Sequence, residues 1–223
     1  MRGKLIVFEG IDACGKATQS DRLTRRRNAR LWSFPTYETV TGQAILSNLQ
    51  QLWAPSVKHN PENLSATLQF LDALVRQSLF AVNRHEHAGT IERTLAAGQD
   101  VVCDRYWPSG YVFGIADGLD GDWLIRIHER LPQPDCFLLL DISPEVSIQR
   151  RLERRDRYEK DDKAAIRRAM YLTLFKRQAL RGEPWHIIDG SGTVEEVERS
   201  IWLKLADTFG VDFNSTNTNL APL

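Results

Sequence analysis

The stretch Phe8–Thr18, which reads FEGIDACGKAT, carries the strongest signal in this chain of 223 residues. It follows an apolar run, Leu5–Phe8, that predicts a buried strand, and it continues into a helical pattern that begins near Lys16. Its spacing matches G-x-x-x-x-G-K at a turn between a strand and a helix. The stretch therefore predicts a phosphate-binding loop.

The residue types in this loop allow the backbone to approach an anion closely. Two glycines let successive N–H groups point at one phosphate, and the lysine can reach the outer phosphates of a bound nucleotide. Ala17 stands where such loops normally carry a Mg²⁺-binding Ser or Thr. Thr18 is an alternative metal ligand, although one residue along a helix rotates its side chain by about 100°. The expected cofactor-binding residues are Gly10, Ala13, Cys14, Gly15, Lys16, Ala17 and Thr18.

Length and composition favour one domain without a polyanionic partner. Lys and Arg number 29, as do Asp and Glu, which argues against a protein that wraps nucleic acid. Cys14, Cys103 and Cys136 lack metal-ligand spacing, so we expect reduced thiols in a cytoplasmic setting. Because no long apolar stretch or leader is found, we expect no contact with a membrane.

Four further apolar runs predict a parallel sheet in which strands alternate with helices. A carboxylate ends one of these runs, at Asp104, where phosphate-loop enzymes orient Mg²⁺ or its waters. The predicted further strands are Ala29–Phe34, Asp100–Asp104, Cys136–Asp141 and Trp185–Asp189. The predicted helices cover 18–30, 39–53, 61 to about 87, a separate segment ending at Gly98, and segments starting after Ser143 and Thr193.

The helix predicted from Pro61 carries an apolar stripe that is either core or part of a subunit interface. Its members are Leu64, Leu68, Leu71, Val75 and Leu79. At the end of this helix His85 and His87 face different ways, so we expect surface residues and no metal site.

An arginine-rich segment follows the fourth strand, at about 150–163. On its own such a segment is typical of an exposed, ion-paired helix face. Behind a phosphate loop it favours a mobile lid that closes over the phosphates. The polar tail at 214–223 has no core-forming pattern, so residues 1–213 are expected to form the domain.

Taken together, the motifs resemble those of the thymidylate kinase family over nearly the whole chain. The resemblance rests on Phe8-Glu9-Gly10-x-Asp12 with Gly15-Lys16 and Thr18-Gln19, Phe34-Pro35, Asn83-Arg84, Asp104-Arg105-Tyr106 with Ser109-Gly110, Leu131–Asp135 and Arg157-Tyr158-Glu159. It implies a three-layer P-loop kinase fold with a five-stranded parallel sheet, ATP and Mg²⁺ as cofactors, transfer of the ATP γ-phosphate to dTMP, and a homodimer.

The resemblance also implies roles for single residues. Asp12 would face the 3′-hydroxyl of the acceptor sugar, Phe80 would stack on the base and Arg84 would donate to base O4. Phe113 would lie under the sugar, and Asp104 would hold Mg²⁺ through water. The implied catalytic residues are Asp12, Lys16, Arg105, Arg155 and Arg157, and the implied substrate-binding residues are Asp12, Phe34, Pro35, Tyr37, Phe80, Arg84, Arg105, Ser109, Gly110, Phe113 and Tyr158.

Two departures from the family pattern leave alternatives open. Ala17 removes the usual metal-ligating hydroxyl, and Tyr37 stands where the family usually has an arginine that clamps the acceptor phosphate. Another acceptor, such as dUMP, a 5-substituted dUMP or several deoxynucleotides, is therefore an alternative to dTMP. A nucleotide-binding module without catalysis is a further alternative.

Overall fold

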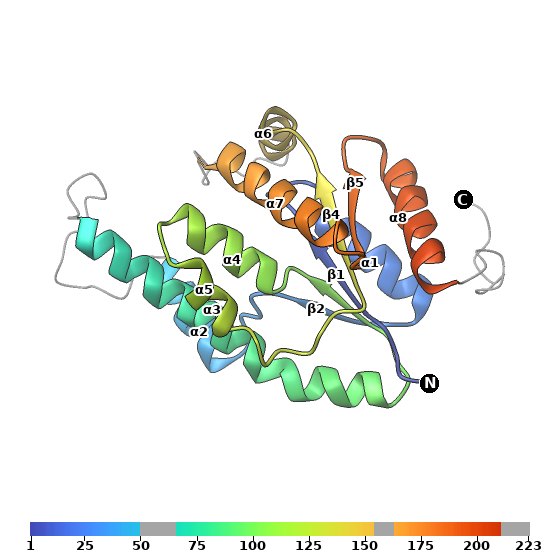
Figure 1. Ribbon diagram of the computed structural model, residues 1–223, viewed down its shortest axis with the longest axis horizontal. Helices are drawn as coiled ribbons and strands as arrows, with labels where there is room; N and C mark the ends of the chain where they lie inside the picture. Colours follow the sequence, from blue (N-terminus) through green and yellow to red (C-terminus); the bar gives the residue numbers. More distant parts are fainter. Residues whose placement is uncertain (50–65, 154–162, 211–223) are drawn as a thin grey trace.

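The computed structural model describes residues 1–49, 66–153 and 163–210, and its centre is a five-stranded, all-parallel sheet (Figure 1). The strands are β1 (Leu5–Glu9), β2 (Arg30–Ser33), β3 (Val101–Asp104), β4 (Cys136–Asp141) and β5 (Trp185–Asp189). Their order across the sheet is β2-β3-β1-β4-β5. The predicted α/β class, the strand count and the parallel pairing are thereby confirmed.

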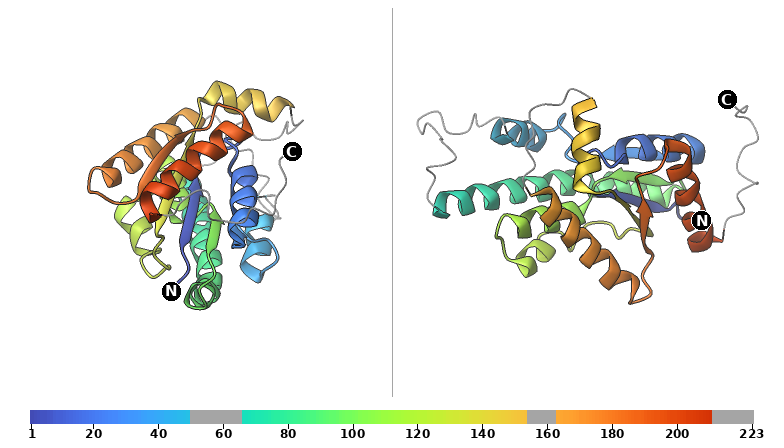
Figure 2. Two further views of the ribbon diagram at one scale, coloured as in Figure 1. Left: turned by 90° about the vertical axis from the view of Figure 1, so that its right-hand side faces the viewer. Right: turned by 90° about the horizontal axis from the view of Figure 1, so that it is seen from above.

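Helices cover both faces of this sheet, giving the three layers that Figure 2 shows from two directions. Helices α1 and α8 pack on one face, and α3, α4 and α7 lie on the other. The helices are α1 (Lys16–Arg27), α2 (Val40–Leu49), α3 (Ala66–Ala96), α4 (Trp107–Ala116), α5 (Gly121–Arg126), α6 (Pro144–Glu153), α7 (Ala164–Ala179) and α8 (Val194–Phe209). Strand β1 is buried along its whole length, as a central strand covered on both faces must be.

The structure joins two predicted helices into one. Helix α3 runs unbroken for 31 residues, so the separate segment predicted to end at Gly98 is wrong. No proline interrupts it, and Gly89 alone costs a helix only about 1 kcal/mol relative to alanine. The prediction that His85 and His87 are surface residues is also wrong. Both are half-buried, because His85 contacts the carbonyl of Ile127 at 2.8 Å and His87 contacts the Thr36 hydroxyl at 2.8 Å.

Other local predictions are confirmed. The Ser143 hydroxyl accepts a hydrogen bond from the Val146 N–H at 3.3 Å at the start of α6, and Thr193 with Glu196 forms a capping box at α8. The three cysteines are buried free thiols. The tail at 214–223 and most of the lid predicted at about 150–163 lie outside the described residues, as does the end of the helix predicted at 39–53.

The apolar stripe on α3 is exposed, so its interpretation as core is wrong for Leu68, Leu71 and Val75, which are 46%, 47% and 37% exposed. These residues lie on the face of α3 opposite its buried residues, such as Ala73 and Ala81. Leu79 is half-buried, and Leu64 lies outside the described residues.

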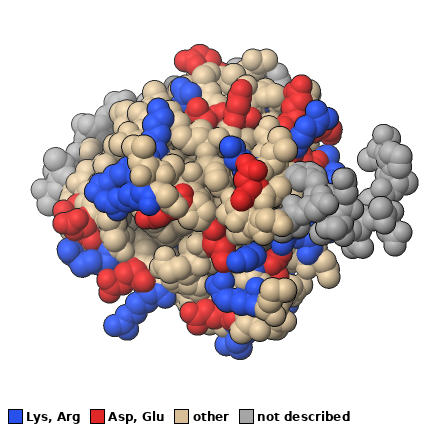
Figure 3. Space-filling model, turned by 45° about the vertical axis from the view of Figure 1, so that its right-hand side comes forward, with Lys and Arg blue, Asp and Glu red and all other residues tan. Residues whose placement is uncertain are grey.

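Charges of both signs are intermixed over the face of the molecule in Figure 3, in keeping with the net charge of zero. No described helix is long and apolar enough to cross a membrane.

Candidate active site

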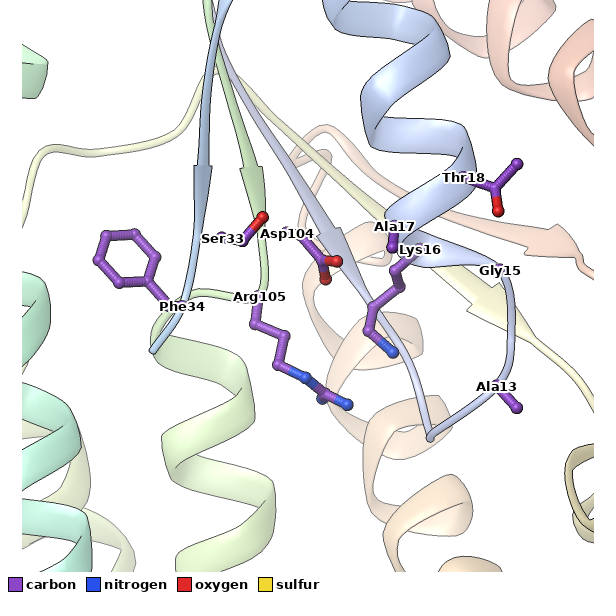
Figure 4. A pocket seen from close by; sticks show the side chains of 9 residues that line it. All are labelled: Ala13, Gly15, Lys16, Ala17, Thr18, Ser33, Phe34, Asp104 and Arg105. Atoms are coloured by element: carbon purple, nitrogen blue, oxygen red, sulfur yellow. The ribbon is translucent and has the colours of Figure 1, made fainter. Parts of the chain in front are cut away.

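The carboxyl ends of three neighbouring strands bring the predicted phosphate loop and acceptor side together. In the sheet register Phe8 pairs with Asp104, and Asp104 pairs with Ser33. The segments that follow these strands therefore leave the sheet side by side, which is where open parallel sheets bind ligands. They enclose a cavity of about 200 Å³ lined by Ala13, Gly15, Lys16, Ala17, Thr18, Ser33, Phe34, Asp104 and Arg105 (Figure 4).

The loop has the backbone of an anion cradle. Gly10, Ala13 and Gly15 have φ values of 143°, 58° and 101°, all left-handed, and α1 begins directly afterwards at Lys16. A Cβ atom on Gly10 would lie 2.6 Å from the carbonyl oxygen of Leu140, so only glycine fits there. The Lys16 ammonium donates to the carbonyls of Gly10 and Ile11 at 3.0 and 2.9 Å, which holds it inside the loop.

Cys14 lies within this loop but is only 2% exposed. Its sulfur is 3.5 Å from the Lys16 ammonium, so the side chain packs inside the loop and its backbone belongs to the cradle.

Asp12 and Arg105 form an ion pair between the loop and the segment that follows β3. Burial acts to raise the pKa of Asp12, but the charges of Arg105, Lys16 and Arg167 outweigh it and hold that pKa below its ordinary value. Arg105 also donates to the carbonyl of Gly10 at 3.3 Å and to the Ser109 hydroxyl at 3.2 Å. Asp12 is therefore an acceptor-only carboxylate next to a fixed cation.

Glu9 holds the turn that carries Arg105, and the sequence analysis did not assign it a role. Its buried carboxylate accepts hydrogen bonds from the Tyr106 and Ser109 N–H groups at 2.8 and 3.2 Å, the Ser109 hydroxyl at 2.6 Å and the Tyr171 hydroxyl at 3.0 Å. Burial raises the pKa of Glu9. These bonds hold the turn in which Arg105 has a left-handed φ of 68°. In the sequence, the place of Glu9 within the Phe8-Glu9-Gly10 motif could have drawn attention to it.

The oxygen atoms near Asp104 fit a metal ion that is held through its bound waters. One carboxylate oxygen of Asp104 is buried and has no hydrogen-bond partner within the described part of the chain. In Figure 4 its carboxylate points toward Lys16, and Ala17 offers only a methyl group on that side of α1. The side chain of Thr18 points away from Asp104, to the other side of α1, so it does not occupy the place of the missing hydroxyl. No cluster of three or more metal-binding side chains occurs in the residues described.

Arg84 lies buried on α3 and is held by groups of its own helix and of the segment after α5. One terminal nitrogen, Nη1, donates to the carbonyl of Phe80 and to Nε2 of His128, both at 3.2 Å. Burial lowers the pKa of Arg84 to about 10, so it remains charged at neutral pH. Phe80, one turn earlier, is half-buried. The predicted base-reading pair is thus on one helix, and His128 is a partner that the sequence analysis missed.

Phe113, on α4, lies beside two arginines. The guanidinium carbons of Arg105 and Arg167 lie 5.6 and 4.1 Å from its ring centroid. Arg167, on α7, was not predicted. The ring therefore packs against the edge of the hydrophobic core and against two cations.

The segment after β2 is fixed by a buried asparagine. The Phe34–Pro35 peptide bond is cis. Asn83 accepts from the Thr36 N–H at 2.9 Å and donates to the Thr36 carbonyl and to the Thr39 and Thr41 hydroxyls at 3.0, 3.1 and 3.1 Å. The segment therefore presents Tyr37 as a 41% exposed side chain at a defined place.

A second cavity, of about 280 Å³, lies on the other side of the loop and was also missed. It is lined by Ala13, Cys14, Gly15, Thr18, Gln19, Arg150, Gly190, Gly192, Thr193, Val194 and Val197. Arg150 donates to the carbonyl of Gly190 at 2.9 Å, and Ser147 donates to the carbonyl of Asp12 at 2.8 Å. The Ser147 bond joins α6 to the phosphate loop, and the Arg150 bond joins α6 to the segment that follows β5. The predicted residues Arg155, Arg157 and Tyr158 lie outside the described residues.

The parallel sheet, the phosphate loop and the cations beside it define a P-loop kinase. A family model described as thymidylate kinase matches residues 8–201. The thymidylate kinase of Arabidopsis thaliana is 36% identical over 208 residues, which cover 90% of this chain and 70% of that protein. The thymidylate kinase of Xanthomonas oryzae pv. oryzae is 32% identical over 231 residues, which cover 99% and 92%.

The solved structure of Candida albicans thymidylate kinase matches with a TM-score of 0.69 at 24% identity, covering 93% of this chain and 92% of that one. The chain belongs to the thymidylate kinase family. Its activity is the phosphorylation of dTMP to dTDP by ATP. The alternative of a nucleotide-binding module without catalysis is therefore wrong.

Proposed function

We propose that transfer takes place in the space between the phosphate loop and Arg105, with Asp12, Lys16 and Arg105 as catalytic residues. The observation that carries this proposal is the meeting of these three side chains at the ends of β1 and β3. Lys16 and the loop N–H groups would hold the donor phosphates, and Arg105 would hold the acceptor phosphate. Phosphoryl transfer requires mainly positioning and charge neutralisation, which these groups supply. Arg155 and Arg157 are proposed to add charge from the lid.

The two cavities suggest how the substrates divide the site. The second cavity, between the loop and the start of α8, would take the nucleoside of ATP. The cavity at Phe34 and Asp104 would take the acceptor phosphate. The remaining proposed acceptor contacts are Pro35, Tyr37, Phe80, Arg84, Ser109, Gly110, Phe113 and Tyr158. Ser109 would act through Glu9 and Arg105, because its hydroxyl contacts both.

We propose that Mg²⁺ is held through its waters by Asp104. The buried, unpartnered oxygen of that carboxylate is the supporting observation, and Ala17 supplies no oxygen. When bound, the ion would neutralise charge on the donor phosphates.

Tyr37 is the feature of this chain that favours an additional acceptor. It is 41% exposed on the segment that follows β2, and a guanidinium there would bind a phosphate more strongly than a phenol does. The Candida albicans enzyme is itself described as having broad substrate specificity. We therefore propose dTMP as the main acceptor, with dUMP, a 5-substituted dUMP or other deoxynucleotides as alternatives.

The test is ATP consumption with Mg²⁺ against dTMP, dUMP, 5-hydroxymethyl-dUMP, dCMP, dGMP and UMP at matched concentrations. Turnover with dTMP that exceeds the others supports the proposal. Higher kcat/KM with another acceptor would overturn the choice of dTMP and direct attention to Tyr37.

We also propose a homodimer formed through α3. The supporting observation is the exposed stripe of Leu68, Leu71, Val75 and Val82, which share one face of the helix. We propose the cytoplasm as the place of action, in keeping with the three free thiols.

A further inference from the structure

A buried histidine contacts the proposed base-reading arginine from the segment that follows α5. His128 is 3% exposed, and its Nε2 atom lies 3.2 Å from Nη1 of Arg84. Its other ring nitrogen, Nδ1, lies 2.7 Å from the carbonyl oxygen of Leu124. A carbonyl can only accept a hydrogen bond, so Nδ1 carries the proton and Nε2 offers a lone pair to Arg84.

The surroundings keep this ring neutral and in place. Burial, together with the positive charge of Arg84, lowers the pKa of His128 to about 3. Gly110 of α4 leaves the room for the ring, because a Cβ atom there would lie 2.8 Å from Cε1 of His128 and 3.3 Å from Nη1 of Arg84. The imidazole is therefore a fixed acceptor wedged between α4 and α3.

The contact determines which nitrogens of Arg84 remain for a substrate. Nη1 uses its two protons on the carbonyl of Phe80 and on His128. Nε is buried without a partner among the described residues. A guanidinium held in this way keeps N–H donors on its remaining edge. These donors can bond to the O4 carbonyl of thymine but not to the amino group of cytosine, which is itself a donor.

From this geometry we propose that His128 is a positioning residue that sets base specificity by orienting Arg84. The inference rests on the proposed role of Arg84 and extends it to a residue that does not itself touch the substrate. Loss of the acceptor lets the guanidinium turn, so the dTMP complex weakens while the ATP side is unchanged. A hydrogen bond to a charged group corresponds to a change of roughly tenfold to hundredfold in affinity.

The experiment compares H128L, which removes the acceptor, with H128Q, whose amide oxygen can take the place of Nε2. Steady-state kinetics with dTMP, dCMP and ATP give KM and kcat for each. We expect H128L to raise the KM for dTMP roughly tenfold to hundredfold, to reduce the dTMP to dCMP ratio of kcat/KM by a similar factor, and to leave the KM for ATP unchanged. H128Q should recover most of the ratio.

The matched control is H85L, because His85 also contacts a backbone carbonyl of the same segment, that of Ile127, but not Arg84. H85L should keep the wild-type ratio. If H128L keeps the ratio, or lowers kcat equally with both acceptors, the inference is wrong.

Two further variants cover the case in which H128L does not fold and test the role of Arg84 separately from that of His128. If H128L does not fold, H128F provides the same test, since its aromatic ring fills the space of the imidazole but offers no acceptor to Nη1 of Arg84. R84M tests the underlying role. An unchanged ratio in R84M refutes base reading by Arg84, whereas a lowered ratio in R84M with a wild-type ratio in H128L or H128F refutes only the inference about His128.

Discussion

Replacing Arg105 with lysine or methionine separates its geometry from its charge. Arg105 pairs with Asp12 and donates to the Gly10 carbonyl and the Ser109 hydroxyl. A lysine keeps the charge but can make only one of these contacts while it also meets a phosphate. With two bonds from a charged donor lost, at about 1.5 kcal/mol each, R105K should lower kcat/KM for dTMP roughly a hundredfold.

Methionine removes the charge as well, which changes the pH dependence. In the wild-type protein Arg105 helps to hold the pKa of Asp12 below its ordinary value, so the carboxylate is ionised at neutral pH and is lost only as the pH falls through that low pKa. In R105M burial remains and the main opposing charge is gone. The acidic limb of kcat/KM should then move up by about one to three pH units.

The assay is the pH profile of kcat/KM for dTMP from pH 4 to 9, with the exposed Arg199 replaced by methionine as the control variant. R105K should keep the position of the acidic limb while losing rate, and R199M should change neither. An acidic limb in R105M that coincides with the wild-type limb would refute the electrostatic role of Arg105 toward Asp12. An R105K variant with wild-type kcat/KM would refute the geometric role.

Three other changes give sharp expectations. Tyr37→Arg should lower the KM for dTMP about tenfold through a charge-assisted phosphate contact, and an unchanged KM in steady-state kinetics would show that this position does not reach the acceptor. Ala17→Thr should lower the Mg²⁺ concentration that gives half-maximal rate, because it adds an oxygen beside Asp104; a metal titration that coincides with wild type would speak against the proposed site. Val75→Glu, which places a charge in the exposed stripe of α3, should convert a dimer to a monomer in analytical ultracentrifugation, and a wild-type sedimentation coefficient would exclude this face as the interface.

The loop and the strand ends could be predicted because their signals are local in sequence. The sequence 8–18 combines a strand, two spaced glycines and a lysine, and Asp104 ends an apolar run. Parallel pairing then leaves little freedom in where these residues meet, as the register of Phe8 with Asp104 shows. The same local reasoning failed for α3, because a single glycine and two histidines do not end a helix whose side chains have tertiary partners.

The residues that hold Arg84 and Arg105 in place could not be predicted, because each acts through a contact with a residue far away in the sequence. Glu9 contacts Tyr171 across 162 positions, and Arg84 contacts His128 across 44. Nothing in the sequence marks His128 as a partner of Arg84, because that contact exists only once α3 and α4 pack around the ring. Burial changes its chemistry, because a ring that ordinarily titrates near neutrality becomes a permanent acceptor. The residues that hold Arg84 and Arg105 in place are therefore found from packing, whereas the two arginines themselves are found from the sequence.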